Sequence, residues 1–318
     1  MMQVVDQYGR TFKTLRVSLL SACNLGCVYC TETDDLGIEN KQQKATALST
    51  QDLTNIIQQL HQVLDLEVIR LTGGEPLLSP HLIPIIKEVK RLGISKIKLT
   101  TNGFLLERLA QPLRDAGMQS INVSLDSVDE DVFFLMSRRN NVKRILSGID
   151  AALDAGLDVK LNAVLMKGIN EQQIIPLLDY AFERKITIRF LEVMRMGHLH
   201  DKSEKYLVRR DEVLHTIAKH HDFVPLIRSA SSTANYWKTG SGNIFGIIAN
   251  ESAPFCHDCN RLRLDSQGNI YGCLSSDHPI NIKNLSEEDL HKKLMEALSH
   301  KQSVKFTGSN LSMLNIGG

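Results

Sequence analysis

Cys23-Asn24-Leu25-Gly26-Cys27-Val28-Tyr29-Cys30 places three cysteines in one short loop, directly after the apolar stretch at residues 15–20. Structural zinc prefers four protein ligands, and an ordinary iron–sulfur cluster takes four cysteines. Three cysteines therefore predict a cluster in which one iron stays open to a non-protein ligand. A zinc knuckle is the alternative, but the sequence has no nearby histidine to complete it.

The other three cysteines, Cys256, Cys259 and Cys273, form a second group near the far end of the chain. In a chain without the apolar run of a signal peptide, six cysteines are more often metal ligands than disulfides. Thiols that act only as small hydrophobic residues would be scattered instead of collected in two groups. The second group therefore also predicts a metal or cluster site.

The composition of the 318 residues is that of a globular protein, with 42% hydrophobic and 23% charged residues. The 37 Lys and Arg residues nearly balance the 36 Asp and Glu residues, so the net charge is +1 and no global basic field for nucleic acid exists. No stretch approaches the roughly 20 apolar residues of a membrane helix. We expect a cytoplasmic protein that binds neither nucleic acid nor membrane and holds any anionic ligand with locally placed Arg and Lys.

Apolar stretches with strand character alternate with segments of helical periodicity along the first 200 residues. The helices after the second, third and fourth strands are expected to end at Gly93, Gly117 and Gly156. Six βα units predict a parallel sheet, and they are fewer than the eight of a closed barrel. The expected fold is α/β, a partial (βα)6 barrel of the TIM type. Its strands are expected at residues 15–20, 68–72, 97–101, 121–125, 159–165 and 186–193.

Polar and apolar residues alternate within these strands, so each set faces one side of the sheet. The apolar set, which includes Val17, Leu71 and Leu99, is expected to face the helices. The polar set then faces the interior, which a barrel kept only for stability fills with branched aliphatic side chains. A cation-lined interior therefore predicts an anionic ligand. The polar set is Arg16, Ser18, Arg70, Thr72, Lys98, Thr100, Asn122, Ser124, Asp126, Lys160 and Asn162.

The pattern changes near residue 200, which divides the chain into a barrel at residues 1–200 and a C-terminal region at residues 201–318. That region is expected to contain a helix from Arg209, strands at residues 243–249 and 261–264, and a last helix over residues 286–300. This smaller α+β region is expected to close the open side of the barrel. His198 and His200, in the polar loop before it, are interpreted as surface residues.

Three motifs follow expected strands, at the edge where such barrels place ligand contacts. In Gly73-Gly74-Glu75-Pro76 the glycines allow close approach of the backbone to a ligand, and Glu75 can accept a hydrogen bond from an ammonium group. Thr100-Thr101-Asn102-Gly103 and Val123-Ser124-Leu125-Asp126 lie at the ends of the next two strands. Each motif is therefore a candidate ligand contact.

The spacing of Cys23, Cys27 and Cys30 resembles the signature of the radical S-adenosylmethionine (SAM) superfamily, whose open iron binds SAM. Residues 73–76 resemble its motif for the amino group of SAM. Residues 255–264 (FCHDCNRLRL), with Cys273, resemble the second cluster motif of the GTP 3',8-cyclase family of molybdenum cofactor biosynthesis. Residues 160–170, 234–237 and 316–318 also resemble that family, so the resemblance covers almost the whole chain.

The resemblance implies two [4Fe-4S] clusters and a set of ligand contacts. The first cluster would be held by Cys23, Cys27 and Cys30, and the second, which binds the guanine of GTP, by Cys256, Cys259 and Cys273. Contacts with SAM are implied at Tyr29, Gly74, Ser124 and Met194. Contacts with GTP and its triphosphate are implied at Arg16, Arg70, Thr101 (or its neighbour Thr100), Lys160, Arg189, Arg261 and Arg263. Catalytic roles are implied for Arg16, Arg261, Arg263, Gly317 and Gly318, because the double glycine of this family enters the barrel.

The implied reaction is a radical cyclisation. SAM would be cleaved to methionine and a 5'-deoxyadenosyl radical, which takes hydrogen from C3' of GTP so that this carbon attacks C8 of guanine. The product would be 3',8-cyclo-7,8-dihydro-GTP, passed on to cyclic pyranopterin monophosphate synthase. The family also implies a homodimer and an electron donor such as flavodoxin.

Two other functions remain open at this point. A radical SAM peptide or sulfatase maturase also carries auxiliary clusters, but usually with more cysteines and without a cation-lined interior. An electron-transfer or zinc-binding module would not be an enzyme, and His278 would then complete a site beside Cys273. Iron content separates a cluster from zinc, and turnover of GTP against a peptide separates the two enzymes.

Overall fold

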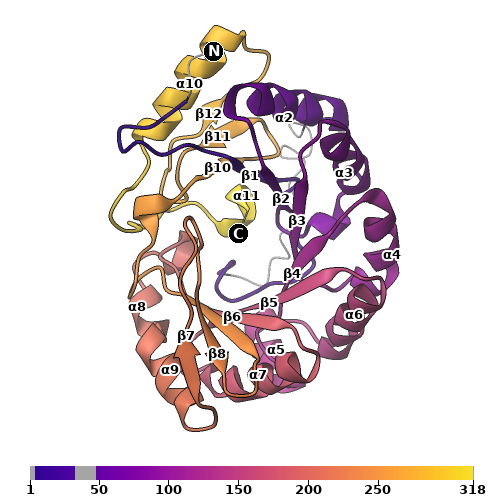
Figure 1. Cartoon of the computed structure of the whole chain (residues 1–318), viewed down its shortest axis with the longest axis vertical. Helices are drawn as coiled ribbons and strands as arrows, with labels where there is room; N and C mark the ends of the chain where they lie inside the picture. The colour runs from indigo at the N-terminus through magenta and orange to yellow at the C-terminus, as the bar shows by residue number, and fades with distance from the viewer. Residues whose placement is uncertain (1–3, 33–47, 318) are drawn as a thin grey trace.

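The computed structural model describes residues 4–32 and 48–317. Its frame is one twelve-stranded sheet that curves around an interior, with helices on the outer face (Figure 1). The six predicted strands are confirmed as a parallel series in chain order. They are β1 (Thr14–Ser18), β2 (Val68–Thr72), β3 (Lys96–Thr101), β4 (Ser120–Ser124), β5 (Asp158–Leu165) and β6 (Thr187–Glu192).

The helices between these strands begin and end where local chemistry dictates. The hydroxyl of Ser49 accepts a hydrogen bond from the amide of Asp52 and so caps α2, while Gly117, with a φ of +108°, ends α4 in the left-handed conformation. No helix within the described ranges is long and apolar enough to cross a membrane. The barrel helices are α2 (Thr50–Leu64), α3 (Leu82–Arg91), α4 (Leu106–Ala116), α5 (Glu130–Ser137), α6 (Val142–Asp154) and α7 (Ile174–Glu183).

The C-terminal region extends both edges of the parallel sheet. Strand β9 (Ile244–Ile248) pairs in parallel with β6, and β10 (Arg261–Leu264) pairs in parallel with β1. Both strands lie where the sequence predicts them, but their partners are a finding of the structure. The sheet does not close into a ring, and α11 (Met313–Ile316) lies inside its curve (Figure 1). The other C-terminal elements are α8 (Ser203–Tyr206), α9 (Arg210–Ala218), β7 (Phe223–Pro225), β8 (Asn235–Thr239), β11 (Asn269–Tyr271), β12 (Ile280–Asn281) and α10 (Glu287–Ser299).

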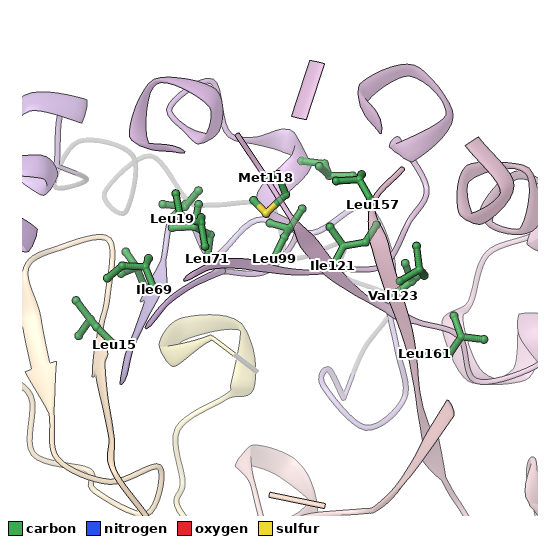
Figure 2. Packing of buried hydrophobic residues seen from close by; sticks show 14 of the residues in the cluster. Leu15, Leu19, Ile69, Leu71, Leu99, Met118, Ile121, Val123, Leu157 and Leu161 are labelled. Carbon is green, nitrogen blue, oxygen red and sulfur yellow. The ribbon is translucent and has the colours of Figure 1, made fainter. Parts of the chain in front are cut away.

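The main core lies between the outer face of the sheet and the helices. Leu15, Ile69, Leu71 and Leu99 of neighbouring strands are buried there, at 0% exposure (Figure 2). Each buries an aliphatic side chain, which stabilises the fold by about 1.5–3 kcal/mol per residue. Because successive strand residues face opposite sides, this packing directs the polar residues between them into the interior. The predicted division of the two faces is confirmed.

Candidate active site

A cavity opens at the carboxyl ends of the barrel strands, beside residues 23–30, which we call the cluster loop. The side chains of Cys23, Cys27 and Cys30 all line it. The structure thus brings the three cysteines together with every residue implied to contact SAM. Those residues are Tyr29, Gly74, Ser124 and Met194.

The cluster loop is fixed to the last turn of α5. The amide of Gly26 donates to the carbonyl of Ser137, and the amide of Val28 donates to the carbonyl of Met136, each over 2.9 Å. The guanidinium of Arg138 donates back to the carbonyl of Gly26 at 3.2 Å. Carbonyls in the last turn of a helix lack partners within the helix, so α5 supplies the acceptors that shape the loop.

Two further side chains, those of Asp126 and His198, hold the same loop from segments that follow β4 and β6. The hydroxyl of Tyr29 donates to the carboxylate of Asp126 at 2.9 Å. Nε2 of His198 lies 2.9 Å from the carbonyl oxygen of Val28. His198 is half-buried and in contact with the cluster loop, which corrects its interpretation as a surface residue. No periodicity or motif marks it in the sequence.

Gly74 lies where a larger residue cannot fit, because a Cβ there would be 2.2 Å from the carbonyl oxygen of Ala22. The next residue, Glu75, is fully buried and accepts hydrogen bonds from the hydroxyl of Thr101 (2.6 Å) and the amide of Asn102 (2.7 Å). Burial raises the pKa of this carboxyl to about 7, although the hydrogen bonds act to lower it. Glu75 therefore holds the turn together, and a hydrogen bond from an ammonium group of a ligand to Glu75 stays a prediction.

The thiols of the cluster loop are free and partly buried. Burial raises the pKa of Cys23 to about 11, and burial together with the nearby Cys30 raises that of Cys27 well above its ordinary value. Within the described ranges, no three His, Cys, Asp or Glu side chains converge on a single metal ion. Cysteine thiolates are the ligands of iron–sulfur clusters, and three of them line one cavity here, so these thiols fit a cluster.

Positive side chains line the interior in register across four neighbouring strands. Arg16 of β1 pairs in register with Arg263 of β10 and with Arg70 of β2, and Arg70 pairs in register with Lys98 of β3. Burial holds the pKa of Arg16 well below its usual range, and the positive charges of Arg263 and Arg70 lower it further. Desolvation, followed by the charge of Arg189, lowers the pKa of Arg70 to about 10. We call Arg16, Arg70, Lys98 and Arg263, together with Arg189 of β6, the cation row.

The cation row lacks compensating negative charge within the described residues. The groups that shift the pKa values of Arg16, Arg70 and Arg263 include no carboxylate in that part of the chain. Two guanidinium nitrogens of Arg189 are buried there without a hydrogen-bond partner. Lys160, which pairs in register with an asparagine of β4, stands on the neighbouring strand. The arrangement therefore favours a multiply charged anion in the interior.

The two candidate threonines of β3 face different partners. Thr100 accepts a hydrogen bond from Arg70 at 3.4 Å and so belongs beside the cation row. The hydroxyl of Thr101 is buried and bonded to Glu75. Of Thr100 and Thr101, Thr100 is thus the one that lies beside the cation row.

Arg189 and Met194 both belong to the interior, although strict alternation would put them on opposite faces. Strand β6 ends at Glu192, one residue earlier than predicted, so Met194 no longer follows its alternation. The carboxylate of Glu192 accepts hydrogen bonds from the amides of Glu251 (2.9 Å) and Ser252 (3.0 Å), which fixes this departure from the sheet.

The C-terminal tail enters the barrel (Figure 1). Arg263 and Arg16 both donate hydrogen bonds to the carbonyl of Gly317, the second at 3.4 Å. The φ of Gly317 is +73°, and a Cβ at this position would lie 2.5 Å from a methyl group of Thr72. Glycine is therefore required at residue 317. Gly318 lies outside the described residues.

The second cysteine group lies at the amino end of β10. Cys256 and Cys259 precede this strand, and Cys273 follows β11, which runs antiparallel to it. All three thiols are free, and they interact electrostatically. Burial acts to raise the pKa of Cys259, but the charges of Arg261 and Lys301 and hydrogen bonds from both residues lower it to about 7.

The histidine considered as a fourth ligand has another partner. The ring of His278 lies against that of His300, with 4.9 Å between the ring centroids. His278 therefore packs against another histidine of the described residues, and its role as a ligand beside Cys273 has no further support there.

Two family models cover most of the chain. Residues 17–181 match the Radical SAM superfamily, and residues 186–309 match Molybdenum Cofactor Synthesis C. The first range contains the cluster loop and strands β2 to β5, while the second contains the other cysteine group.

Curated relatives align over nearly the full length. The chain is 37% identical to the GTP 3',8-cyclase of Synechocystis sp. over 315 residues, which cover 99% of this chain and 95% of that one. It is 38% identical to the GTP 3',8-cyclase of Staphylococcus haemolyticus, over 92% of this chain and 89% of that one. The enzyme of the same name from Marinobacter nauticus is 33% identical over 97% and 94% of the two chains.

Solved structures support the fold. Streptococcus suis SuiB bound to its precursor peptide SuiA superimposes with a TM-score of 0.66 at 16% identity, covering 91% of this chain and 67% of that one. The anSMEcpe structure with bound AdoMet gives a TM-score of 0.57 at 16% identity, with 91% and 84% covered. Because the cyclases match from end to end and the family models cover both parts, the chain belongs to the GTP 3',8-cyclase family of the radical SAM superfamily.

Proposed function

We propose that this protein cyclises GTP to 3',8-cyclo-7,8-dihydro-GTP, the first step of molybdenum cofactor biosynthesis. The observation that carries the proposal is the cation row, in which Arg16 lies in register between Arg263 and Arg70 and is repelled by both in a desolvated interior. A triphosphate supplies the missing negative charge, and guanidinium groups bind phosphate through paired, charge-assisted hydrogen bonds.

The cavity at the carboxyl ends would hold the first cluster and SAM. Cys23, Cys27 and Cys30 would ligate a [4Fe-4S] cluster, which together with SAM supplies the radical chemistry of this superfamily. Tyr29 and Gly74 would orient SAM, and Asp126 keeps the tyrosine in place through its hydrogen bond. The narrow turn at Gly74 lets the backbone approach the ligand.

The second cysteine group would hold a second [4Fe-4S] cluster that receives the guanine. Cys256, Cys259 and Cys273 are its ligands in this proposal. Arg261 follows Cys259 by two residues, and Arg263 faces Arg16 in register. The base would thus be fixed beside β10 while its triphosphate extends along the cation row.

The tail would act by positioning arginines. The carbonyl of Gly317 accepts hydrogen bonds from both Arg16 and Arg263. It therefore holds two guanidinium groups at fixed positions in spite of their mutual repulsion. We propose that Gly318 belongs to the same site.

The wider setting follows the family. We propose that a flavodoxin-like protein donates electrons, that the protein forms a homodimer, and that cyclic pyranopterin monophosphate synthase takes the product. Six free thiols favour a reducing cytoplasm. Residues 1–200 would carry the radical chemistry, and residues 201–318 would carry substrate anchoring.

The decisive experiment is turnover of purified, anaerobically reconstituted protein with SAM and dithionite. GTP should yield the cyclised nucleotide, identified by mass spectrometry, together with 5'-deoxyadenosine. ATP serves as the matched control, because it has the same triphosphate and a different base. Cleavage of SAM without any GTP-derived product would refute the proposal and favour a maturase.

A further inference from the structure

The ammonium group of Lys301 lies deep in the molecule beside the second cysteine group. The side chain is 4% exposed, and it follows α10, whose end packs against the chain just before Cys273. Gly272 allows this approach, because a Cβ there would lie 2.0 Å from the carbonyl oxygen of Ala297. The absence of a side chain at residue 272 therefore brings Lys301 to the cluster ligands.

Lys301 uses its donors on the segments that carry the cysteines. Its Nζ donates to the carbonyl of Arg261 at 2.8 Å and to the carbonyl of Gly272 at 2.7 Å. Its positive charge also interacts with the thiol of Cys259. One ammonium thus joins the strand after Cys259 to the residue before Cys273.

The charge of Lys301 has no carboxylate partner among the groups that act on it in the described residues. The groups of opposite charge that do act are the thiols of Cys259 and Cys273, and Arg261 opposes them. A buried ammonium is costly unless it is paired and hydrogen-bonded. Three thiolates on a cluster would provide the negative charge, whereas three neutral thiols would not.

We propose that Lys301 is a positioning residue of the second cluster, which clamps its ligand segments and raises its reduction potential through a hydrogen bond to the sulfur of Cys259. This inference rests on the proposed second cluster. Net charge and hydrogen bonds to sulfur are among the factors that set the potentials of such clusters. A fixed positive charge stabilises the reduced, more negative form.

The test uses the full chain carrying Cys23→Ala, Cys27→Ala and Cys30→Ala, so that only the second cluster assembles. In this background, Lys301→Met removes the buried charge, and Lys305→Met removes an exposed lysine of the same segment as the matched control. Iron and sulfide content, the EPR spectrum of the reduced cluster and its midpoint potential are measured anaerobically. We expect Lys301→Met to shift the potential to more negative values and to change the EPR line shape, while Lys305→Met matches the background.

The iron content of the background protein separates a failure of the second cluster from a failure of the role of Lys301. If the background protein binds no iron, the proposed second cluster is wrong and this inference falls with it. If the background binds about four irons and Lys301→Met leaves both potential and spectrum unchanged, only the role of Lys301 is refuted. If Lys301→Met fails to retain iron, Lys301→Arg decides: recovery of iron with an altered spectrum supports the clamp, and no recovery despite native circular dichroism refutes a role based on charge.

Discussion

Replacing Arg70 with Met should stabilise the ligand-free protein and weaken GTP binding at once. Burial and the charges of Arg189 and Arg261 lower the pKa of Arg70 from its usual 12.5 to about 10. At about 1.36 kcal/mol per pH unit, this corresponds to a destabilisation of at most about 3 kcal/mol. At pH 7 the guanidinium is protonated in both the folded and the unfolded state, so the destabilisation is present in full. It begins to fall only as the pH rises above about 10, where the folded state loses the proton.

The same substitution removes a charge-assisted contact with the triphosphate. Such a contact is worth about 1.5–3 kcal/mol, so Kd for GTP should rise about 10- to 150-fold. With GTP at about 100 times the wild-type Kd, ligand binding stabilises the wild type by about 2.7 kcal/mol, and the variant by only about 0.3–1.4 kcal/mol.

The assay is anaerobic urea unfolding followed by circular dichroism, with and without GTP, together with calorimetric titration of GTP. Lys87→Met is the control, because this exposed lysine lies on α3, on the outer face of the sheet. Arg70→Met could instead unfold at a lower urea concentration than the wild type and be stabilised by GTP as much as the wild type is. That result would show that Arg70 neither destabilises the protein by repulsion nor binds the triphosphate.

Four other substitutions test the remaining parts of the site. Cys27→Ala should reduce reconstituted iron from about eight to about four per chain and abolish SAM cleavage, whereas Cys259→Ala should leave uncoupled SAM cleavage without cyclisation; normal cyclisation by Cys259→Ala would contradict the division of labour. Arg261→Ala should raise Kd for GTP about 10- to 150-fold, as measured by titration, and an unchanged Kd would make it a merely structural residue of β10. Gly317→Ala, or a C-terminal tag, should leave iron content and SAM binding intact while GTP conversion collapses, since a methyl group at residue 317 meets Thr72; a tagged protein as fast as the untagged one would show that the tail is dispensable.

The sequence predicts local elements well, and the site in part. Strand periodicity predicts β1 to β6 and directs Arg16 and Arg70 into the interior, because alternation within a strand is a local property. It does not predict that β10 pairs with β1, because pairing between segments at opposite ends of the chain depends on the whole fold. For the same reason His198 and Lys301 were missed. Their partners lie far away in the sequence, and neither residue belongs to a local motif.

The parallel pairing of β1 with β10 fixes how far apart the two cysteine groups lie along the sheet. Cys259 stands two residues before β10, at the amino end of the pair, and Cys23 lies beyond Ser18, at the carboxyl end. The four residue steps of β1 span about 13 Å at about 3.3 Å per residue. Side-chain substitutions leave that span unchanged, because hydrogen bonds between backbones define it. A change in the separation of the two cysteine groups along the sheet would therefore require a shift of strand register or an insertion in both strands, and not merely different side chains.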